Sequence, residues 1–258
     1  MKKVTAFIGS QSKKATYRAV QQFEKNLKQY GEIDIEYVFL SDYHLEFCRG
    51  CKLCFIKGEE YCPLKDDRDI LMEKMEYSDG VIFATPNYAF QVSARMKNFL
   101  DRLAFIDHRP RFFGKTCTAI VVQGFHGGGD ILKYLYFASE TMGFHVSKGC
   151  CATTLDPMTK LQHERLTRKI EKTSAGFYKE LLRPTPAPSF FKLMLFRFGR
   201  TFVKTVDQKL RDYQYYEEKG WFEADYYYTT SLKPIKRLAG NLFDLLGRRV
   251  SKIMGGEA

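Results

Sequence analysis

The chain has 258 residues, of which 45% are hydrophobic, enough for one full domain and a substantial appendage. No run approaches the roughly eighteen uninterrupted apolar residues of a transmembrane helix, so the sequence predicts no membrane span. The formal net charge is +11, but no nucleic-acid recognition motif accompanies the basic residues, so we expect no nucleic-acid partner.

Strands and helices are predicted to alternate from Val4 to about Arg183. Nearly continuous apolar runs are typical of parallel strands buried on both faces, and strict alternation is typical of a half-exposed edge strand. Apolar residues that recur every three or four positions predict helices between the strands. The apolar runs cover 4–8, 81–84 and 119–122, the alternation covers 33–39, and the helical stripes cover 20–30, 92–103, 131–142 and 166–181.

Because strands separated by helices need crossover connections, this pattern predicts a doubly wound parallel sheet. An edge position for the second strand favours the order 2-1-3-4-5 of the flavodoxin-like arrangement over the six-stranded dinucleotide fold. We therefore predict an α/β fold: a flavodoxin-like, doubly wound, five-stranded parallel sheet over residues 1–183, followed by an α-helical C-terminal extension over 184–258.

The loop between the first predicted strand and helix is rich in hydroxyls. These hydroxyls and the amides that open the helix can hold a phosphate through hydrogen bonds and the helix dipole. The loop lacks G-x-G-x-x-G, so it carries no dinucleotide fingerprint. An ordinary serine-rich turn that caps the helix is the alternative. The candidate binding residues are Ser10, Gln11, Ser12, Lys13 and Thr16.

Four cysteines, Cys48, Cys51, Cys54 and Cys62, fall within fifteen residues. Three thiols at consecutive two-residue spacings can reach three corners of a metal–sulfur cube. The fourth is followed by Pro63, much as the last cysteine of bacterial ferredoxin runs is followed by proline. This insertion, 48–62, favours a 4Fe–4S cluster with these four cysteines as metal ligands.

Other uses of the four thiols stay open. The seven-residue gap before the last cysteine is longer than the three-residue gap of the ferredoxin run, which leaves unliganded thiols as a serious alternative. A zinc ribbon usually offers two separated pairs, which this segment lacks. A disulfide fits poorly because the chain opens with Met-Lys-Lys-Val and no signal peptide, from which we expect a cytoplasmic protein.

Two further loops should meet the first at the carboxyl ends of the strands, where ligands of open parallel sheets bind. The loop after the third strand presents amides and an aromatic face against which a planar ring can lie. The loop after the fourth strand is glycine-rich, so its backbone can approach a ligand closely. For the loop after the third strand, the alternative is that its aromatic side chains merely pack against the end of the sheet. For the loop after the fourth strand, the alternative is a flexible turn without a ligand. The candidate residues are Pro86, Asn87, Tyr88, Ala89 and Phe90, then Gln123, Gly124, Gly127 and Gly128.

These motifs together resemble the NADPH-dependent FMN reductase family and, within it, the iron–sulfur flavoproteins. The resemblance spans roughly residues 3–182. It implies FMN, with its phosphate in the 10–16 loop and its isoalloxazine between the 86–90 and 123–128 loops. The first loop departs from the family pattern at Ser10-Gln11-Ser12 and Ala15, where Lys13, Lys14 and backbone amides can compensate. The resemblance is carried by 9–16, the four cysteines, 63–67, 79–88 and 96–102.

The extension carries much of the basic excess, with 13 Lys and Arg against 8 Asp and Glu in residues 184–258. Two basic amphipathic segments, 191–210 and 235–253, flank a segment rich in tyrosine and acids. Such helices gain stability by burying their apolar faces elsewhere. We expect them to pack on the domain or to complete a homodimer, and peripheral contact with a membrane surface is the less favoured alternative.

The resemblance implies an FMN-dependent oxidoreductase that passes electrons from NAD(P)H or a ferredoxin to a small acceptor such as a flavin or a quinone. A 4Fe–4S cluster would act as a one-electron relay. No side chain is singled out as a catalytic acid or base, because the protein positions the cofactor and tunes its potential. The alternative is a non-catalytic flavin- or metal-binding redox sensor whose basic tail docks a partner or a membrane.

Overall fold

A computed structural model describes residues 1–154 and 157–253 of the chain; residues 254–258 of the expected extension lie outside the described residues. The chain divides into two compact units. The first unit is formed by Met1–Arg49 and Leu64–Pro184. The second is formed by Gly50–Pro63 together with the chain from Thr185 onward, so most of the cysteine segment groups with the C-terminal extension.

The first unit is built on a parallel sheet with the order β2-β1-β3-β4-β5, and β6 also pairs with β4. The predicted flavodoxin-like order 2-1-3-4-5 is therefore confirmed, with the fifth position shared by two short strands. β2 carries partly or fully exposed residues from Asp34 to Tyr37, as expected of an edge strand, and its last two residues are buried. The strands are β1 (Lys2–Ile8), β2 (Ile33–Phe39), β3 (Gly80–Pro86), β4 (Thr116–Gln123), β5 (His145–Val146) and β6 (Cys150–Thr153).

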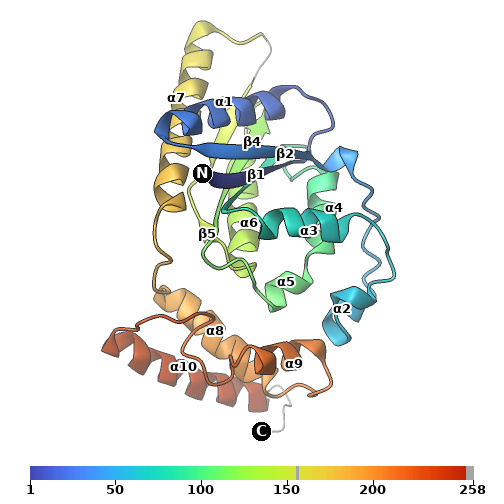
Figure 1. The fold of residues 1–258 in the computed structure, drawn as a ribbon, viewed down its shortest axis with the longest axis vertical. Helices are drawn as coiled ribbons and strands as arrows, with labels where there is room; N and C mark the ends of the chain where they lie inside the picture. The colour runs from blue at the N-terminus through green and yellow to red at the C-terminus, as the bar shows by residue number, and fades with distance from the viewer. Residues whose placement is uncertain (155–156, 254–258) are drawn as a thin grey trace. The chain divides into compact units, whose positions relative to one another are not determined.

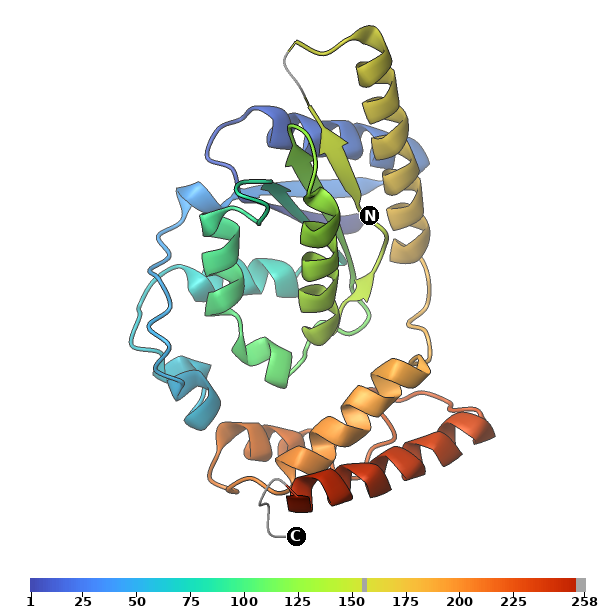
Figure 2. The same cartoon turned by 180° about the vertical axis from the view of Figure 1, so that it is seen from behind.

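Helices cover both faces of this sheet (Figures 1 and 2). α1 (Ala15–Tyr30) and α7 (Lys160–Leu181) pack on one face over a core that includes Val4, Ile82 and Ile120. On the other face Phe7 stacks on Phe99 of α4, with ring centroids 5.0 Å apart. The remaining helices of this unit are η1 (Leu40–Asp42), α3 (Arg68–Glu76), α4 (Ala94–Arg102), α5 (Phe105–His108) and α6 (Gly128–Thr141).

α1 ends at Tyr30, immediately before Gly31, where the sequence predicts its end. Gly31 has an extended backbone with φ of 172°, so it is not the left-handed cap that a terminal glycine usually provides. A Cβ on Gly31 would lie 2.3 Å from the Tyr178 hydroxyl oxygen. A side chain at this position would therefore displace the Tyr178 ring of α7, which approaches the end of α1 closely.

The second unit has an aromatic core in which Phe196, Tyr216, Trp221 and Tyr226 are buried. Trp221 donates its indole N–H to the Tyr227 carbonyl at 3.0 Å, which satisfies its polar group inside this core. The short helix of the cysteine segment, α2, packs against α9. The helices of this unit are α2 (Leu53–Ile56), η2 (Glu59–Tyr61), α8 (Phe190–Val203), α9 (Arg211–Glu218) and α10 (Pro234–Ile253).

The first amphipathic segment of the extension is shorter than predicted. α8 ends at Val203, so Val206 and Leu210 do not continue its apolar stripe as the spacing indicated. Asp207 begins a turn, in which its carbonyl accepts from the Leu210 amide at 2.9 Å and its carboxylate accepts from the Lys209 amide at 2.9 Å. An aspartate that bonds its neighbouring backbone in this way favours turns over helix.

Candidate functional site

The carboxyl ends of β1 and β3 are tied together by Ser93, which opens α4. Its hydroxyl donates to the Gly9 carbonyl at 2.8 Å, and its amide donates to the Thr85 hydroxyl at 3.0 Å. The same hydroxyl accepts from the Met96 amide and caps α4. The first two candidate loops therefore leave the sheet side by side, at the point where the strand order reverses. Ser93 was not among the predicted site residues, although its position just before a helical stripe is typical of a helix cap.

The first loop presents a helix amino end without a side-chain cap. α1 begins at Ala15, its cap position is Lys14, and its first turn holds no acid. The Ser10 hydroxyl and the Lys14 amide both donate to the Ser12 carbonyl, at 3.3 and 2.8 Å. In the structure, therefore, no serine side chain caps this helix, contrary to the alternative of an ordinary capping turn. An amino end of this kind carries a positive partial charge suited to an anion.

The candidate residues of this loop differ in exposure. Ser10 and Thr16 are buried, whereas Gln11, Ser12 and Lys13 are exposed. The Lys13 ammonium lies over the Phe39 ring, 5.4 Å from its centroid. Buried hydroxyls beside uncapped helix amides, with a lysine nearby, form a donor set that fits a phosphate.

The second loop contains a strained tight turn at 88–91. Tyr88 and Gln91 exchange backbone hydrogen bonds of 3.1 and 3.0 Å, and both residues between them have left-handed backbones, Ala89 with φ of 49° and Phe90 with φ of 62°. Two successive left-handed residues define a type I′ turn, which ordinarily uses glycine or asparagine. Backbone strain of this kind is often found at functional sites. The turn presents Tyr88 and Phe90 to solvent, with 63% and 62% of their surfaces exposed.

Replacing Ala89 with glycine should raise the free energy of unfolding by about 0.5–1 kcal/mol, because glycine adopts the left-handed region without strain. Urea unfolding measures the change. Ala175→Gly, in the exposed interior of α7, is the matched control and should lower stability by about 1 kcal/mol. Equal destabilisation by both substitutions would contradict the left-handed turn.

The third loop is bonded to the second. The Asn87 side-chain amide donates to the His126 carbonyl at 2.8 Å, and the Asn87 backbone amide donates to Val122 at 2.7 Å. Gly127 has φ of 92°, and a Cβ there would lie 2.7 Å from the Phe90 ring. Glycine is therefore required at this position for backbone conformation and for the approach of the two loops.

Gln123 and its neighbours shape the third loop. Gln123 accepts from the Gly128 amide at 2.7 Å and donates to the Phe125 carbonyl at 3.2 Å, so its side chain is engaged within the loop. A Cβ on Gly124 would meet no atom within 4 Å. The structure thus gathers Asn87, Phe90 and Gly127, whose aromatic and backbone surfaces fit a planar ring such as isoalloxazine.

The four candidate metal ligands do not form a metal site in the described structure. Cys48 and Cys51 are exposed, Cys54 and Cys62 are partly exposed, and the described cysteines form no disulfide. Residues 1–154 and 157–253 contain no group of three or more histidine, cysteine or carboxylate side chains placed to hold a metal ion. Four thiols at these spacings have the donor chemistry that a cluster needs.

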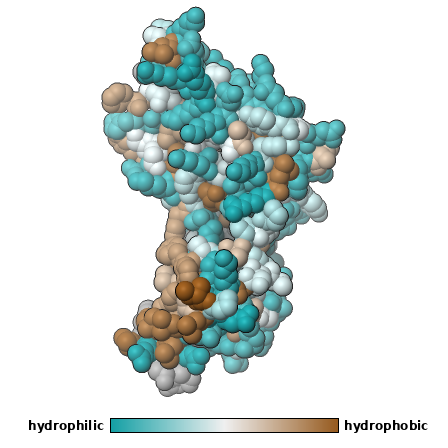
Figure 3. Space-filling view, turned by 90° about the vertical axis from the view of Figure 1, so that its left-hand side faces the viewer, coloured by the Kyte–Doolittle hydropathy of each residue, from teal (hydrophilic) through white to brown (hydrophobic). Residues whose placement is uncertain are grey.

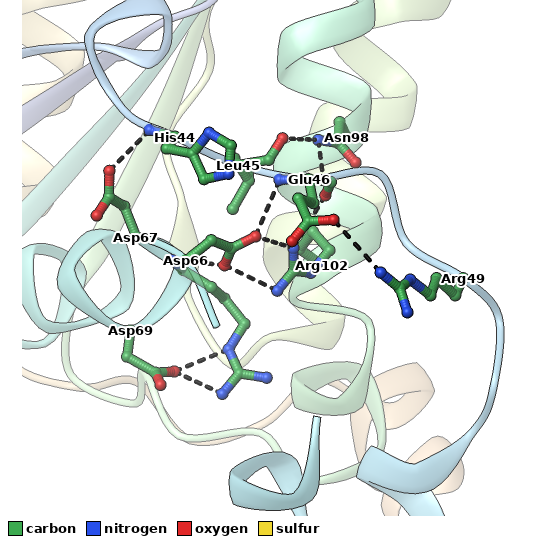
Figure 4. Close-up of polar contacts among 10 residues, drawn as sticks. His44, Leu45, Glu46, Arg49, Asp66, Asp67, Asp69, Asn98 and Arg102 are labelled. Carbon is green, nitrogen blue, oxygen red and sulfur yellow. Dashed lines mark hydrogen bonds and ion pairs between the residues drawn. The ribbon is translucent and has the colours of Figure 1, made fainter. Parts of the chain in front are cut away.

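The segment just before the cysteine run is bonded to Asp66, just after it (Figure 4). The Asp66 carboxylate accepts from the Glu46 amide at 2.9 Å and from Arg102 Nη2 at 2.9 Å. Arg102 also donates to the Glu46 carbonyl at 2.9 Å. The side chains of Arg102 and Asp66 are 2% and 0% exposed, so this is a fully buried ion pair.

Burial opposes ionisation of Asp66, yet hydrogen bonds from Arg102 and from the Glu46 and Arg68 amides hold the pKa of its carboxyl below the ordinary value. Asp67 and Asn98 add to the same arrangement. Asp67 accepts from the His44 amide at 2.7 Å, and Asn98 donates to the Leu45 carbonyl at 3.0 Å. Asp66, Asp67, Asn98 and Arg102 lie in the ranges that carry the family resemblance, but their sequence context predicted no role for them.

Three comparisons with known proteins bear on this site. The family model for NADPH-dependent FMN reductase matches residues 2–152. An iron–sulfur flavoprotein of Archaeoglobus fulgidus is 30% identical over 204 residues, which cover 76% of this chain and 89% of that protein. An iron–sulfur flavoprotein of Methanocaldococcus jannaschii is 34% identical over 130 residues, which cover 50% of this chain and 65% of that protein.

Solved structures share the fold at low identity. The structure of RosB with bound 8-demethyl-8-formylriboflavin-5'-phosphate matches with a TM-score of 0.57 and 12% identity. The match covers 91% of this chain and 92% of the RosB chain. The structure of an azoreductase from Bacillus anthracis matches with a TM-score of 0.54 and 13% identity. The match covers 69% of this chain and 100% of the azoreductase chain. At these identities the likeness concerns the fold.

Proposed function

The chain belongs to the NADPH-dependent FMN reductase family and is an NAD(P)H-dependent oxidoreductase of that type, and from this premise we propose that it passes electrons from NAD(P)H, or from a ferredoxin, to a small acceptor such as a flavin or a quinone. The observation that carries the proposal is the meeting of three candidate loops at the reversal of strand order. When bound, FMN supplies hydride and single-electron chemistry.

The chain's own residues bind, orient and shield the cofactor in this proposal. Ser10, Thr16 and the opening amides of α1 would hold the phosphate. The Tyr88–Gln91 turn and the loop around Gly127 would hold the ring. Steady oxidation of NADPH by the FMN-loaded protein, with a quinone as acceptor, tests the proposal. Binding of FMN without any turnover, from NADPH or reduced ferredoxin, would instead favour the redox sensor.

We also propose that Cys48, Cys51, Cys54 and Cys62 ligate a 4Fe–4S cluster. The proposal is supported by four thiols at short spacings and by relatives that are named iron–sulfur flavoproteins.

Replacing any one of the four cysteines with serine should remove most of the iron while FMN remains bound, because a cube that loses a thiolate ligand is labile. Iron, sulfide and flavin are measured on anaerobically reconstituted protein. Cys151→Ser, outside the run, is the control and should keep the iron content of the unaltered protein. Near-zero iron in the unaltered protein after reconstitution would exclude the cluster and support the free-thiol alternative.

A homodimer in the cytoplasm is the assembly we propose for this activity. Tyr88, Phe90 and Phe125 are exposed around the candidate ring site, and a second subunit would shield a ring bound there. Sedimentation of the FMN-loaded protein measures the assembly. A monomer that retains FMN and full turnover would show that the site needs no second subunit.

A further inference from the structure

α8 and α10 pack against each other through small and charged residues. A Cβ on Gly240 would lie 3.2 Å from the Arg197 guanidinium, and one on Gly247 would lie 3.2 Å from Thr201. Between these contacts Asp244, itself buried, accepts from Arg197 at 2.8 Å and also from Arg200. The contact between the two helices therefore uses their polar and small faces.

The apolar stripes of the two helices consequently face outward. In α10, Leu238 is 72% exposed and Leu242 is 54% exposed, although both belong to the stripe that sequence analysis expected to be buried. We define the outward apolar stripes of α8 and α10 together as the apolar face of the extension. Figure 3 shows apolar side chains gathered on this unit. Its exposed members are Phe191, Leu195, Phe202, Ile235, Leu238, Leu242, Leu245 and Ile253.

The charges beside the apolar face are positive. α8 contains no acid, and the only acid of α10 is Asp244, which is buried in the ion pairs with Arg197 and Arg200. Arg237, Arg248 and Arg249 of α10 are exposed. Arg249 follows Leu242 and Leu245 at helical spacing, so it lies along the apolar stripe itself.

A second copy of the chain is a poor match for this face. A two-fold interface would place the arginines of one copy near those of the other, with no exposed acid on either helix to pair with them. Three acids elsewhere in the extension are paired with cations of their own unit: Glu218 with Arg211, Glu223 with Lys204 and Asp225 with Arg197. An anionic lipid surface offers the complementary charge and an apolar layer.

We propose that the apolar face of the extension docks the protein on an anionic membrane surface. The leucines and phenylalanines enter the boundary between headgroups and acyl chains, and the arginines extend to anionic headgroups. No described helix is long and apolar enough to cross a membrane. The contact that we propose is peripheral. This inference does not depend on the redox activity, because it uses none of the residues assigned to FMN or to the cluster.

Co-sedimentation of the full-length protein with vesicles tests the proposal. The protein should pellet with vesicles that contain phosphatidylglycerol and phosphatidylcholine, and not with pure phosphatidylcholine. Leu238→Ser with Leu242→Ser should weaken partitioning by about tenfold for each leucine that inserts. Arg248→Gln with Arg249→Gln should weaken it by about fivefold for each arginine, and added salt should reduce that difference.

Matched controls lie in the first unit. Phe137→Ser removes an exposed apolar side chain of α6, and Arg165→Gln with Arg168→Gln removes exposed cations of α7. Both should leave partitioning unchanged. Equal binding to neutral and anionic vesicles, or no binding, would overturn the proposal. A lipid-free dimer that Leu238→Ser with Leu242→Ser dissociates, without vesicle binding, would overturn it and assign the face to a second copy.

Discussion

Replacing Ser10 and Thr16 together with alanine should weaken FMN binding by about a hundredfold. Each hydroxyl that bonds a charged phosphate contributes roughly 1.5–3 kcal/mol, and water and the α1 amides would recover part of the loss. Both side chains are buried beside the uncapped start of α1, so their removal changes the loop without exposing a new charge. Titration of the apoprotein with FMN gives the two dissociation constants.

The control for this experiment is Ser139→Ala with Thr173→Ala, which removes two buried hydroxyls outside the three candidate loops. The Ser139 hydroxyl donates to the Leu135 carbonyl and is also bonded to Cys117 Sγ, and the Thr173 hydroxyl donates to the Lys169 carbonyl. That double variant should lose stability while keeping its affinity for FMN. An unchanged FMN dissociation constant in the variant lacking the Ser10 and Thr16 hydroxyls would show that the phosphate is held elsewhere.

Replacing Arg102 with leucine should lower the free energy of unfolding by about 3–5 kcal/mol, because it leaves the Asp66 carboxylate buried without its main partner. Urea unfolding measures the loss. Adding Asp66→Asn should recover part of it, since the second change removes the unpaired charge. Full additivity of the two substitutions would contradict the ion pair, because residues in direct contact give coupled effects.

The same pair predicts a dependence of stability on pH. The pKa of Asp66 is lowered in the folded protein, so its contribution to stability is present above the unfolded pKa of about 3.9 and is lost as pH falls through the lower folded value. Asp66→Asn should therefore lose less stability than the unaltered protein over that acid range. Parallel acid unfolding curves would show that Asp66 does not contribute.

The central sheet could be predicted from the sequence because its strands are short apolar runs buried on both faces. The fifth strand could not be located in this way. β5 and β6 are two and four residues long and are separated at Gly149, where a Cβ would lie 2.0 Å from the Ala119 carbonyl oxygen. A tertiary contact of this kind leaves no periodic signal in the chain.

The extension shows where periodicity is informative and where it is not. Spacing indicated helices with apolar stripes, and α8 and α10 form where most of those residues lie. It could not indicate which face of each helix is buried. Asp244 bonds Arg197 and Arg200 across forty-odd residues of sequence, and glycines allow the two helices to approach, so they meet through polar and small residues rather than through the predicted apolar stripes.

The candidate site was predictable at the level of its loops. Topology brings the ends of β1, β3 and β4 to one edge of the sheet, which makes the three loops neighbours. The contacts that position them were not predictable, since Ser93 bonds Gly9 from a distance of 84 residues and the Ala89–Phe90 turn uses residues that ordinarily avoid left-handed backbone. Strained conformations at a binding loop depart from local preference by their nature.

The visible absorbance spectrum of anaerobically purified protein, recorded before and after NADPH is added, tests the central proposal most directly. We expect flavin bands from FMN bound to the chain, with a broad shoulder if a 4Fe–4S cluster is present. The flavin bands should bleach when NADPH is added and return when a quinone follows. Protein that takes up no FMN, or whose bound flavin is reduced neither by NADPH nor by reduced ferredoxin, would contradict the proposed oxidoreductase.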